Sequence, residues 1–245
     1  MHKSLIILER ISESGGATAR DVAEELGIPL PTVYRLAKGL ERDGYLVHVR
    51  HHGRFELGHK LLYLGVALQR QVRINPRVRS EVASLKGRLA FTDAAYFFAL
   101  RGTDSAIGFQ VSAHGGRMLS VALAGRAHAT AIGKVVLANL DAEQRQRYLD
   151  LHGCARFTDL TVVDPATLDS LFKVGQARAV HWEIEEYEAG RSAAALAVHD
   201  AQGELRGVLG VSCPPALRVD ETRSVGVALR ETCIRIEHVL RGADS

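Results

Sequence analysis

The chain has 245 residues, of which 47% are hydrophobic and 24% charged, proportions that are typical of soluble globular proteins. Its length suffices for about two domains with a sizeable core, whereas no apolar run reaches the roughly 20 residues that a membrane-spanning helix needs. The three cysteines form no C-x-x-C pair, so neither a disulfide framework nor a zinc ribbon is indicated. The N-terminal stretch is too short and too charged for a signal peptide, and we expect a cytoplasmic protein that does not contact a membrane.

Charge is divided unevenly along the chain. Residues 1–80 contain 13 Lys and Arg against 8 Asp and Glu, whereas residues 81–245 contain 18 against 20. A basic N-terminal third followed by a slightly acidic remainder is typical of a nucleic-acid-binding head joined to a body with another role.

Two helices are predicted first. Residues 4–13 have the apolar spacing of a packing helix, which the SGG sequence at 14–16 ends. Thr18 and Asp21 then have the spacing of a capping box, in which each side chain binds the backbone N–H of the other residue. A second helix is therefore expected to begin directly after Thr18.

Residues 19–38 fit the spacing of a helix-turn-helix. Val22 and Leu26 lie one helical turn apart, and Gly27 follows where the chain must turn sharply with φ > 0. A unit of this kind places its second helix in the major groove of DNA. The alternative is a generic helical hairpin.

The second helix of this unit has an apolar side formed by Val33, Leu36, Ala37 and Leu40 and a cationic side opposite. Pro31 suits its first turn, where a missing N–H costs nothing. Cations on the outer face are what contact with phosphates and bases requires, although a solvated charged face is the alternative. The DNA-contacting residues predicted here are Thr32, Tyr34, Arg35, Lys38 and Arg42. The first three are expected to contact base edges, and Lys38 is expected to contact phosphate.

Residues 41–58 are predicted to form a β-hairpin wing. Tyr45, Val47 and Val49 alternate in its first strand, and Phe55 and Leu57 alternate in its second. Gly53 marks the tip, whose predicted DNA-contacting residues are Arg50, His51, His52 and Arg54. The histidines here have no Cys or carboxylate at ligand spacing beside them, so no metal site is predicted.

A helical run at 58–76 follows the wing. Its apolar residues recur every three to four positions, at Leu61, Leu64, Leu68 and Val72. A helix this apolar must pack against something, and a second subunit is favoured because dimeric heads read paired half-sites. Packing on the protein's own body is the alternative.

From residue 77 onward the pattern is mixed. Helices are predicted at 78–90, 128–140, 141–151, 164–180 and 219–240, and strands at 93–101, 105–113 and 118–123, with a strand–turn–strand hairpin at 192–212 that turns at 200–203. Consecutive strands joined by short turns indicate an antiparallel sheet with flanking helices, which is an α+β fold.

Three segments resemble the IclR family of bacterial transcription regulators. TVYRLAKGLERDGYL at 32–46 resembles that family's recognition helix and wing entry, and HATAIGKVVLA at 128–138 resembles its H-x-T-A-x-G-K-x-x-L-A signature. IEEYEAG at 184–190, followed by D-x-x-G at 200–203, resembles its second signature. The resemblance covers nearly the whole chain. It implies an N-terminal winged helix-turn-helix (1–58), a linker and dimerisation helix (59–75), and a GAF-like antiparallel effector-binding domain (76–245).

The resemblance also implies an effector pocket on one face of the sheet. The residues carried over to it are Met118, Ala131, Ile132, Glu183, Ala193, Gly210 and Ser212, for each of which ordinary core packing is the alternative. Ala193 stands where many members have Cys, and Gly210 where Ser is frequent. A pocket with fewer polar groups and more room favours a bulky, possibly aromatic, organic acid. Its carboxylate is expected to meet Arg117, His114 or Arg126.

The function predicted from these features is a regulator that binds a palindromic operator as a homodimer or homotetramer under the control of a small organic acid. The chain has neither G-x-S-x-G nor H-E-x-x-H, and His152 beside Cys154 is no evidence of a catalytic pair. No catalytic residue, metal or cofactor is therefore expected. An enzyme with an accessory DNA-binding head and an architectural dimer without ligand are the alternatives.

Two charged features are expected to be structural. Lys134 is predicted to lie on a helix surface or to reach a backbone carbonyl, because the Gly133-Lys134 pair lacks the rest of a P-loop. The acidic run that contains Glu183, Glu185, Glu186 and Glu188 is expected to form a solvated loop.

Overall fold

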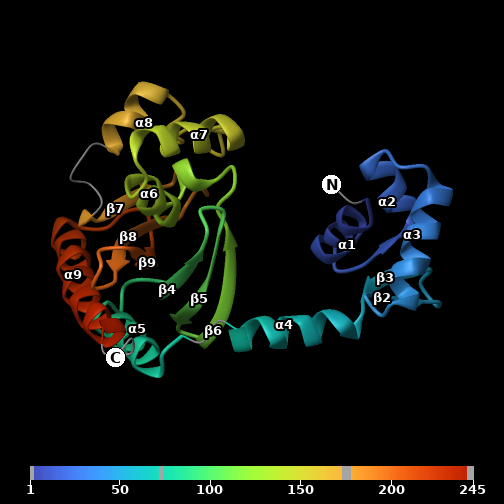
Figure 1. The fold of residues 1–245 in the computed structure, drawn as a ribbon, viewed down its shortest axis with the longest axis horizontal. Helices are drawn as coiled ribbons and strands as arrows, with labels where there is room; N and C mark the ends of the chain where they lie inside the picture. Colours follow the sequence, from blue (N-terminus) through green and yellow to red (C-terminus); the bar gives the residue numbers. More distant parts are fainter. Residues whose placement is uncertain (1–2, 72–73, 173–177, 242–245) are drawn as a thin grey trace. The chain divides into compact units, whose positions relative to one another are not determined.

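The computed structural model describes residues 3–71, 74–172 and 178–241. The chain forms two compact units, Met1–Arg73 and Ile74–Ser245 (Figure 1). Their boundary falls within the predicted linker segment 59–75, whose helix belongs to the first unit.

The first unit is a winged helix-turn-helix with one further helix. Its elements are α1 (Lys3–Glu13), β1 (Ala17–Thr18), α2 (Ala19–Leu26), α3 (Leu30–Arg42), β2 (Leu46–Val49), β3 (Arg54–Leu57) and α4 (His59–Gln71). The three strands pair antiparallel in the order β1-β3-β2. The helices and strands share one apolar core, in which Ile7, Val22, Val33 and Phe55 are buried.

The predicted helix signals are confirmed at α2. The Thr18 hydroxyl accepts the Asp21 N–H at 3.2 Å, and the Asp21 carboxylate accepts the Thr18 N–H at 3.0 Å. Gly27 ends the helix with φ 61°, a conformation that glycine adopts at little cost. Pro31 lies in the first turn of α3.

The apolar alternation of the first wing strand does not mark its buried face. Leu46 is buried and Val47 is 47% exposed, so the strand presents the alternate set of residues to the core. His48 stacks on Phe55 with ring centroids 4.7 Å apart. The alternation gives no sign of this face because a histidine is counted as a polar residue, although the imidazole ring of His48 packs on a core aromatic ring. Leu57 is likewise exposed rather than buried.

The second unit is an α+β domain, as predicted. Its helices are α5 (Pro76–Arg88), η1 (Ala127–Ala129), α6 (Ala131–Ala138), α7 (Ala142–His152), α8 (Pro165–Leu171) and α9 (Val219–Arg241). Its strands are β4 (Ala94–Arg101), β5 (Ser105–Ser112), β6 (Gly115–Ala122), β7 (His181–Ile184), β8 (Ser192–His199) and β9 (Leu205–Cys213). They form one sheet in the order β6-β5-β4-β9-β8-β7, with antiparallel pairing throughout.

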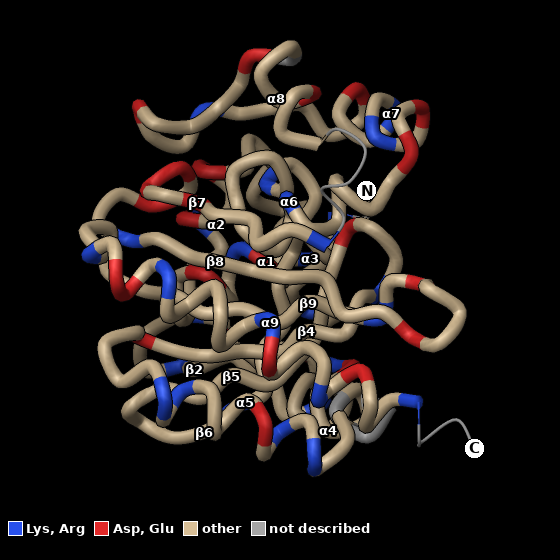
Figure 2. Tube along the Cα trace, turned by 90° about the vertical axis from the view of Figure 1, so that its left-hand side faces the viewer, with Lys and Arg blue, Asp and Glu red and all other residues tan. Residues whose placement is uncertain are grey.

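Alternate residues of the sheet face different helices. Tyr96, Phe98 and Ala195 belong to an apolar cluster with Ile132 of α6. Phe109 points to the other face, where Arg79 of α5 lies over its ring, and α9 packs on β8 and β9. In both views α7 and α8 lie beyond α6, at the end of the unit opposite α5 (Figures 1 and 2).

The prediction and the structure differ in two elements. The helix expected over 164–180 is present only as α8, and residues 173–177 of that prediction lie outside the described residues. The strand β7 was not predicted at all. It is only four residues long, and it forms because β8 offers it an edge to pair with. Val72 of the predicted linker stripe also lies outside the described residues.

Candidate DNA-binding face and effector site

The outer face of α3 is exposed and cationic. Pro31, Tyr34, Arg35, Lys38 and Arg42 are all exposed, and Thr32 is half-buried beside them. Tyr34 is 48% exposed, so a large part of its aromatic ring lies in water and does not pack on the core. Val33 and Ala37 on the opposite face are buried. The helix therefore rests on the core through its small apolar residues and presents its cations to solvent.

The cations of α3 differ in what holds them. The Lys38 Nζ donates to the Glu41 carboxylate at 2.8 Å, and the Arg42 Nε donates to Asp43 at 3.3 Å. Arg35 has no ion pair within the described part of the chain. Exposed pairs of this kind contribute little net energy and exchange readily, so Arg35 is immediately available to a partner and Lys38 becomes available once it leaves Glu41.

The wing supplies a second group of predicted contacts. Arg50, His51 and His52 are exposed in the turn between β2 and β3. Arg54 is different, because it lies in β3 and donates to the backbone carbonyl of Gly16. The Arg54 guanidinium is therefore bound next to β1, so Arg54 does not belong with the exposed tip residues, among which it was predicted.

The sheet brings several of the predicted effector residues together. Glu183, Ala193 and Ser212 are direct cross-strand partners in one row across β7, β8 and β9. Gly210 lies in the next row on the same face, and Ala131 and Ile132 begin the helix α6 that covers this face. Six of the seven predicted residues therefore lie on or over one surface.

Met118 is the exception. Its strand partner is Phe109, which belongs to the opposite face of the sheet, and its sulfur lies 3.9 Å from the Arg79 guanidinium of α5. Side chains alternate between faces along a strand, so Met118 is separated from the row of Glu183 by the sheet itself. We correct its placement accordingly.

Gly210 does not leave the open space that its small size suggested. A Cβ added to it would lie 2.5 Å from the hydroxyl oxygen of Tyr96 and 2.6 Å from the Ala194 carbonyl oxygen. Tyr96 is the direct strand partner of Gly210, so its ring and hydroxyl occupy the place of the missing side chain. Sequence reasoning missed Tyr96, although the alternation in the strand at 93–101 was a signal that it faces the same way as Phe98.

Glu183 is buried in this surface. Its Oε1 accepts the backbone N–H of Glu186 at 2.8 Å and that of Tyr187 at 3.2 Å. Burial raises the pKa of the Glu183 carboxyl in spite of these hydrogen bonds, because an apolar environment disfavours the charged form. Burial and the nearby Glu183 carboxylate also raise the pKa of Tyr96, which keeps its hydroxyl protonated as a hydrogen-bond donor.

Lys134 holds the segment that carries Glu183. Its side chain is buried, and its Nζ donates to the Trp182 carbonyl at 3.0 Å and forms an ion pair with Glu186. The expectation that Lys134 reaches a backbone carbonyl is confirmed, and the alternative of a helix surface is wrong. An ammonium group inside the protein requires a partner, and Glu186 supplies it.

The acidic run, red in Figure 2, is the expected solvated loop only in part, because Glu188 is exposed and Glu185 half-buried, whereas Glu183 lies in β7 itself. Glu183 and Glu186 are buried. The hydroxyl of Thr158 donates to the Glu185 carbonyl at 2.6 Å, and that of Thr161 donates to the Glu186 carbonyl at 2.6 Å. A run of acidic residues gives no sign of these partners, because they come from distant parts of the sequence.

The three cations expected to meet an acid are exposed. Arg117 lies on β6 and shares the face of Tyr96 through their common strand neighbour Gln110. The Arg126 guanidinium lies 5.8 Å from the ring centroid of Tyr187. His114 lies at the tip between β5 and β6. Arg117 therefore lies on the effector face at the far edge of the sheet, and Arg126 lies beside the segment that follows Glu183.

No group of three or more His, Cys, Asp and Glu residues in the described part of the chain is arranged to hold a metal ion. Among the helices of residues 3–71, 74–172 and 178–241, none is long and apolar enough to cross a bilayer.

Comparison with known proteins assigns both units. Residues 2–50 match the family description "IclR helix-turn-helix domain", and residues 104–238 match "Bacterial transcriptional regulator IclR C-terminal". The chain is 29% identical to the HTH-type transcriptional repressor AllR of Klebsiella pneumoniae over 98% of this chain and 89% of that protein.

Solved structures share the fold. A structure from Silicibacter sp. TM1040, described as an IclR transcriptional regulator, aligns with a TM-score of 0.70 at 19% identity over 97% of this chain and 96% of that one. An IclR homologue from Microbacterium hydrocarbonoxydans, crystallised with 4-hydroxybenzoate, aligns with a TM-score of 0.67 at 21% identity over 98% and 100%.

Proposed function

Because the chain belongs to the IclR family of bacterial transcriptional regulators, we propose that α3 and the wing tip bind operator DNA and that the surface around Glu183 binds the controlling effector. The observation that carries the first part is the exposed cationic face of α3, opposite its buried apolar face. The relatives are named as repressors rather than enzymes, which agrees with the prediction of a regulator without catalytic residues. Its place of action would be the cytoplasm, where bacterial DNA lies.

On the DNA side, Thr32, Tyr34 and Arg35 would read base edges, and Lys38 and Arg42 would contact phosphates. Arg50, His51 and His52 extend this surface along the wing. Arg54 is not included, since its guanidinium is bound to the Gly16 carbonyl.

Fluorescence anisotropy with a duplex from the intergenic region upstream of the protein's own gene tests this interface. Replacing Arg35 by Ala should cost about 1–3 kcal/mol of binding free energy and relax specificity at one position if Arg35 reads a base. Arg156→Ala, an exposed change in the other unit, is the matched control. Uniform weakening on all sequences would reassign Arg35 to phosphate, and unchanged binding at low salt would contradict the interface.

On the effector side, the proposed site comprises Ala131, Ile132, Glu183, Ala193, Gly210 and Ser212, to which the structure adds Tyr96. Small apolar side chains and one phenol line this surface, which favours a ligand with an aromatic ring. The bound 4-hydroxybenzoate of the Microbacterium relative supports the same chemical class. The cations that would meet the carboxylate are Arg117 and Arg126.

A calorimetric titration with 4-hydroxybenzoate, glyoxylate and pyruvate distinguishes the ligand classes. At 100 times its dissociation constant a ligand adds close to 2.7 kcal/mol of stability, so a thermal-shift screen gives an independent measurement. Tight binding of the two- and three-carbon acids without any response to the aromatic acid would refute the aromatic class. Failure of every organic acid would favour the architectural alternative.

Dimerisation through α4 is the third part of the proposal. Leu62 and Tyr63 are 71% and 70% exposed, and Leu64, Val66 and Leu68 are also exposed. Large apolar side chains that gather in contact with water mark an association surface, and a dimer would place two heads on the half-sites of a palindrome. Light scattering on the wild type and on Leu62→Glu tests it, because a charge in a dimer interface should lower the apparent mass, whether from a dimer or from a tetramer.

A further inference from the structure

We propose that a cavity between α7 and α8 is a second small-molecule site, which takes a six-membered ring or short chain bearing a carboxylate and pairs that carboxylate with Arg145. The cavity has a volume of about 170 Å³. Cavities of roughly 150 Å³ in protein cores hold benzene, so the space suffices for one ring. None of its lining residues belongs to the effector surface proposed above, and the inference does not depend on that assignment.

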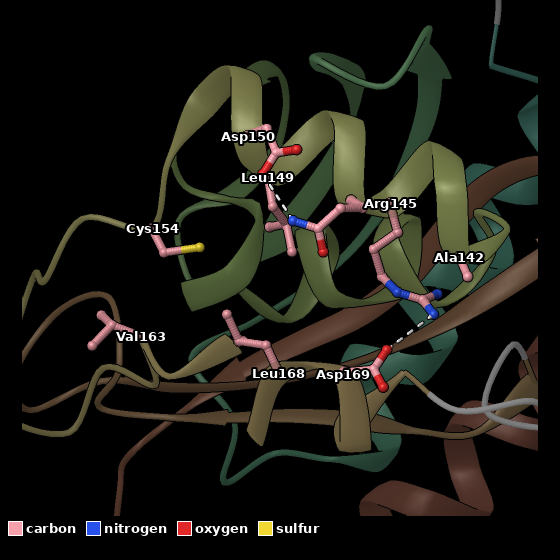
Figure 3. Close-up of a pocket in the computed structure, with 9 residues that line it drawn as sticks. Ala142, Arg145, Leu149, Asp150, Cys154, Val163, Leu168 and Asp169 are labelled. Atoms are coloured by element: carbon pink, nitrogen blue, oxygen red, sulfur yellow. Dashed lines mark hydrogen bonds and ion pairs between the residues drawn. The ribbon is translucent and has the colours of Figure 1, made fainter. Parts of the chain in front are cut away.

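The cavity has an apolar wall and a polar rim (Figure 3). Leu149 of α7, Leu168 of α8 and Val163 before α8 form the wall. The thiol of Cys154 is directed toward the space between the two helices (Figure 3). A ring placed against this wall would remove its own apolar surface and that of Leu149 and Val163 from water, which is the main source of affinity for small ligands.

Arg145 supplies the charged end and is already held in position. It is 8% exposed, and its Nη1 donates to the carbonyl oxygens of Leu137 at 3.2 Å and Leu140 at 3.1 Å. A guanidinium fixed in this way loses little further freedom when it binds an anion.

On its other side the guanidinium lies 5.8 Å from the ring centroid of Phe172, and within the described residues its one carboxylate partner there is loosely held. Nη2 lies 3.7 Å from the carboxylate of Asp169, which is beyond hydrogen-bond length, and the Asp169 side chain is 67% exposed. Figure 3 shows the two groups facing one another from α7 and α8. A ligand carboxylate would form a charge-assisted hydrogen bond with Nη2, while Asp169 turns to water at little cost.

The remaining rim carboxylate does not compete for Arg145. Asp150 accepts a hydrogen bond from the Gln146 side-chain amide at 2.8 Å, so it is bound at the other end of the cavity. The proposed ligand therefore meets one cation, one thiol and one apolar wall.

Cysteine alkylation reports occupancy of this cavity directly. Cys154 is half-buried and lines the cavity, whereas Cys213 and Cys233 are buried. In native protein, N-ethylmaleimide should therefore react first at Cys154, as followed by peptide mass spectrometry. The probes are benzoate and its neutral isostere benzamide.

Benzoate at ten times its dissociation constant should slow alkylation of Cys154 about tenfold, since only the unoccupied fraction reacts, and benzamide at the same concentration should protect far less. Asp169→Asn should strengthen protection by benzoate, because it removes the competing anion at an exposed position. Asp159→Asn, a change at an exposed loop residue that does not line the cavity, is the matched control and should leave protection unchanged.

Three results would overturn the inference: no protection by benzoate, equal protection by the amide, or protection that ignores Asp169→Asn. The last result would mean that benzoate binds only elsewhere, for example at the effector surface, and acts on Cys154 from a distance. Loss of DNA regulation by organic acids, with Cys154 protection intact, would refute the proposed function alone.

Discussion

Replacement of Lys134 by Met should destabilise the second unit severely. The Lys134 side chain is 5% exposed, and its loss leaves the buried Glu186 carboxylate without its cation. One oxygen of that carboxylate, Oε2, already has no hydrogen-bond partner among the described residues. Removing one member of a buried ion pair costs about 3–5 kcal/mol, because the charge left behind is uncompensated. The lost hydrogen bond to the Trp182 carbonyl adds about 1 kcal/mol.

Urea unfolding followed by tryptophan fluorescence measures this cost. Trp182 is the one tryptophan of the chain, and it lies in β7 beside Lys134, so its emission reports the second unit. The double variant Lys134→Met/Glu186→Leu should recover most of the stability, since an apolar pair can replace a buried ion pair without loss. Lys86→Met is the control, because its Nζ makes only one 3.5 Å hydrogen bond.

A cost of Lys134→Met below about 1 kcal/mol, or a double variant as unstable as the single one, would refute the reasoning.

Three further predictions follow from the described contacts. Affinity for an anionic effector, measured by calorimetry, should rise as the pH is lowered through the raised pKa of Glu183, because the neutral carboxyl no longer repels the ligand. Glu183→Gln should flatten this pH dependence, and a variant with the same pH profile as the wild type would contradict the prediction. Glu41→Gln should release Lys38 for phosphate, tighten DNA binding and steepen the salt dependence by about one unit; an unchanged slope would exclude Lys38 from the interface. Thr18→Ala should remove the N-cap of α2 and cost about 1 kcal/mol in thermal unfolding followed by circular dichroism, whereas the exposed change Ser12→Ala should have no effect.

Local signals predicted the head well. The capping box, the glycine at the end of α2 and the apolar spacing of α3 involve residues within four positions of one another, and such neighbours interact whatever the rest of the chain does. The wing was placed correctly, but its alternation did not show which face is buried, because a short strand does not reveal whether a histidine or a valine side chain meets the core.

The sequence predicted only part of the effector surface. Six of its predicted residues lie on one face, but the face assignment of Met118 depended on the strand register, and a register shift of one residue exchanges the faces. Tyr96 and Gly210 lie more than 100 positions apart in sequence. Their fit exists only because β4 and β9 are neighbours in the sheet.

The order of residues alone determined where the helices of the head begin and end, that strands pair antiparallel, and that the recognition helix carries cations on one side, because these properties arise from spacing along the backbone. Tertiary structure decided which charges are buried and with what partner. Lys134 and Glu186, like Arg145 and Asp169, acquire their roles from pairing between segments that only folding brings together, and the energy of a charge depends on the water that this pairing excludes.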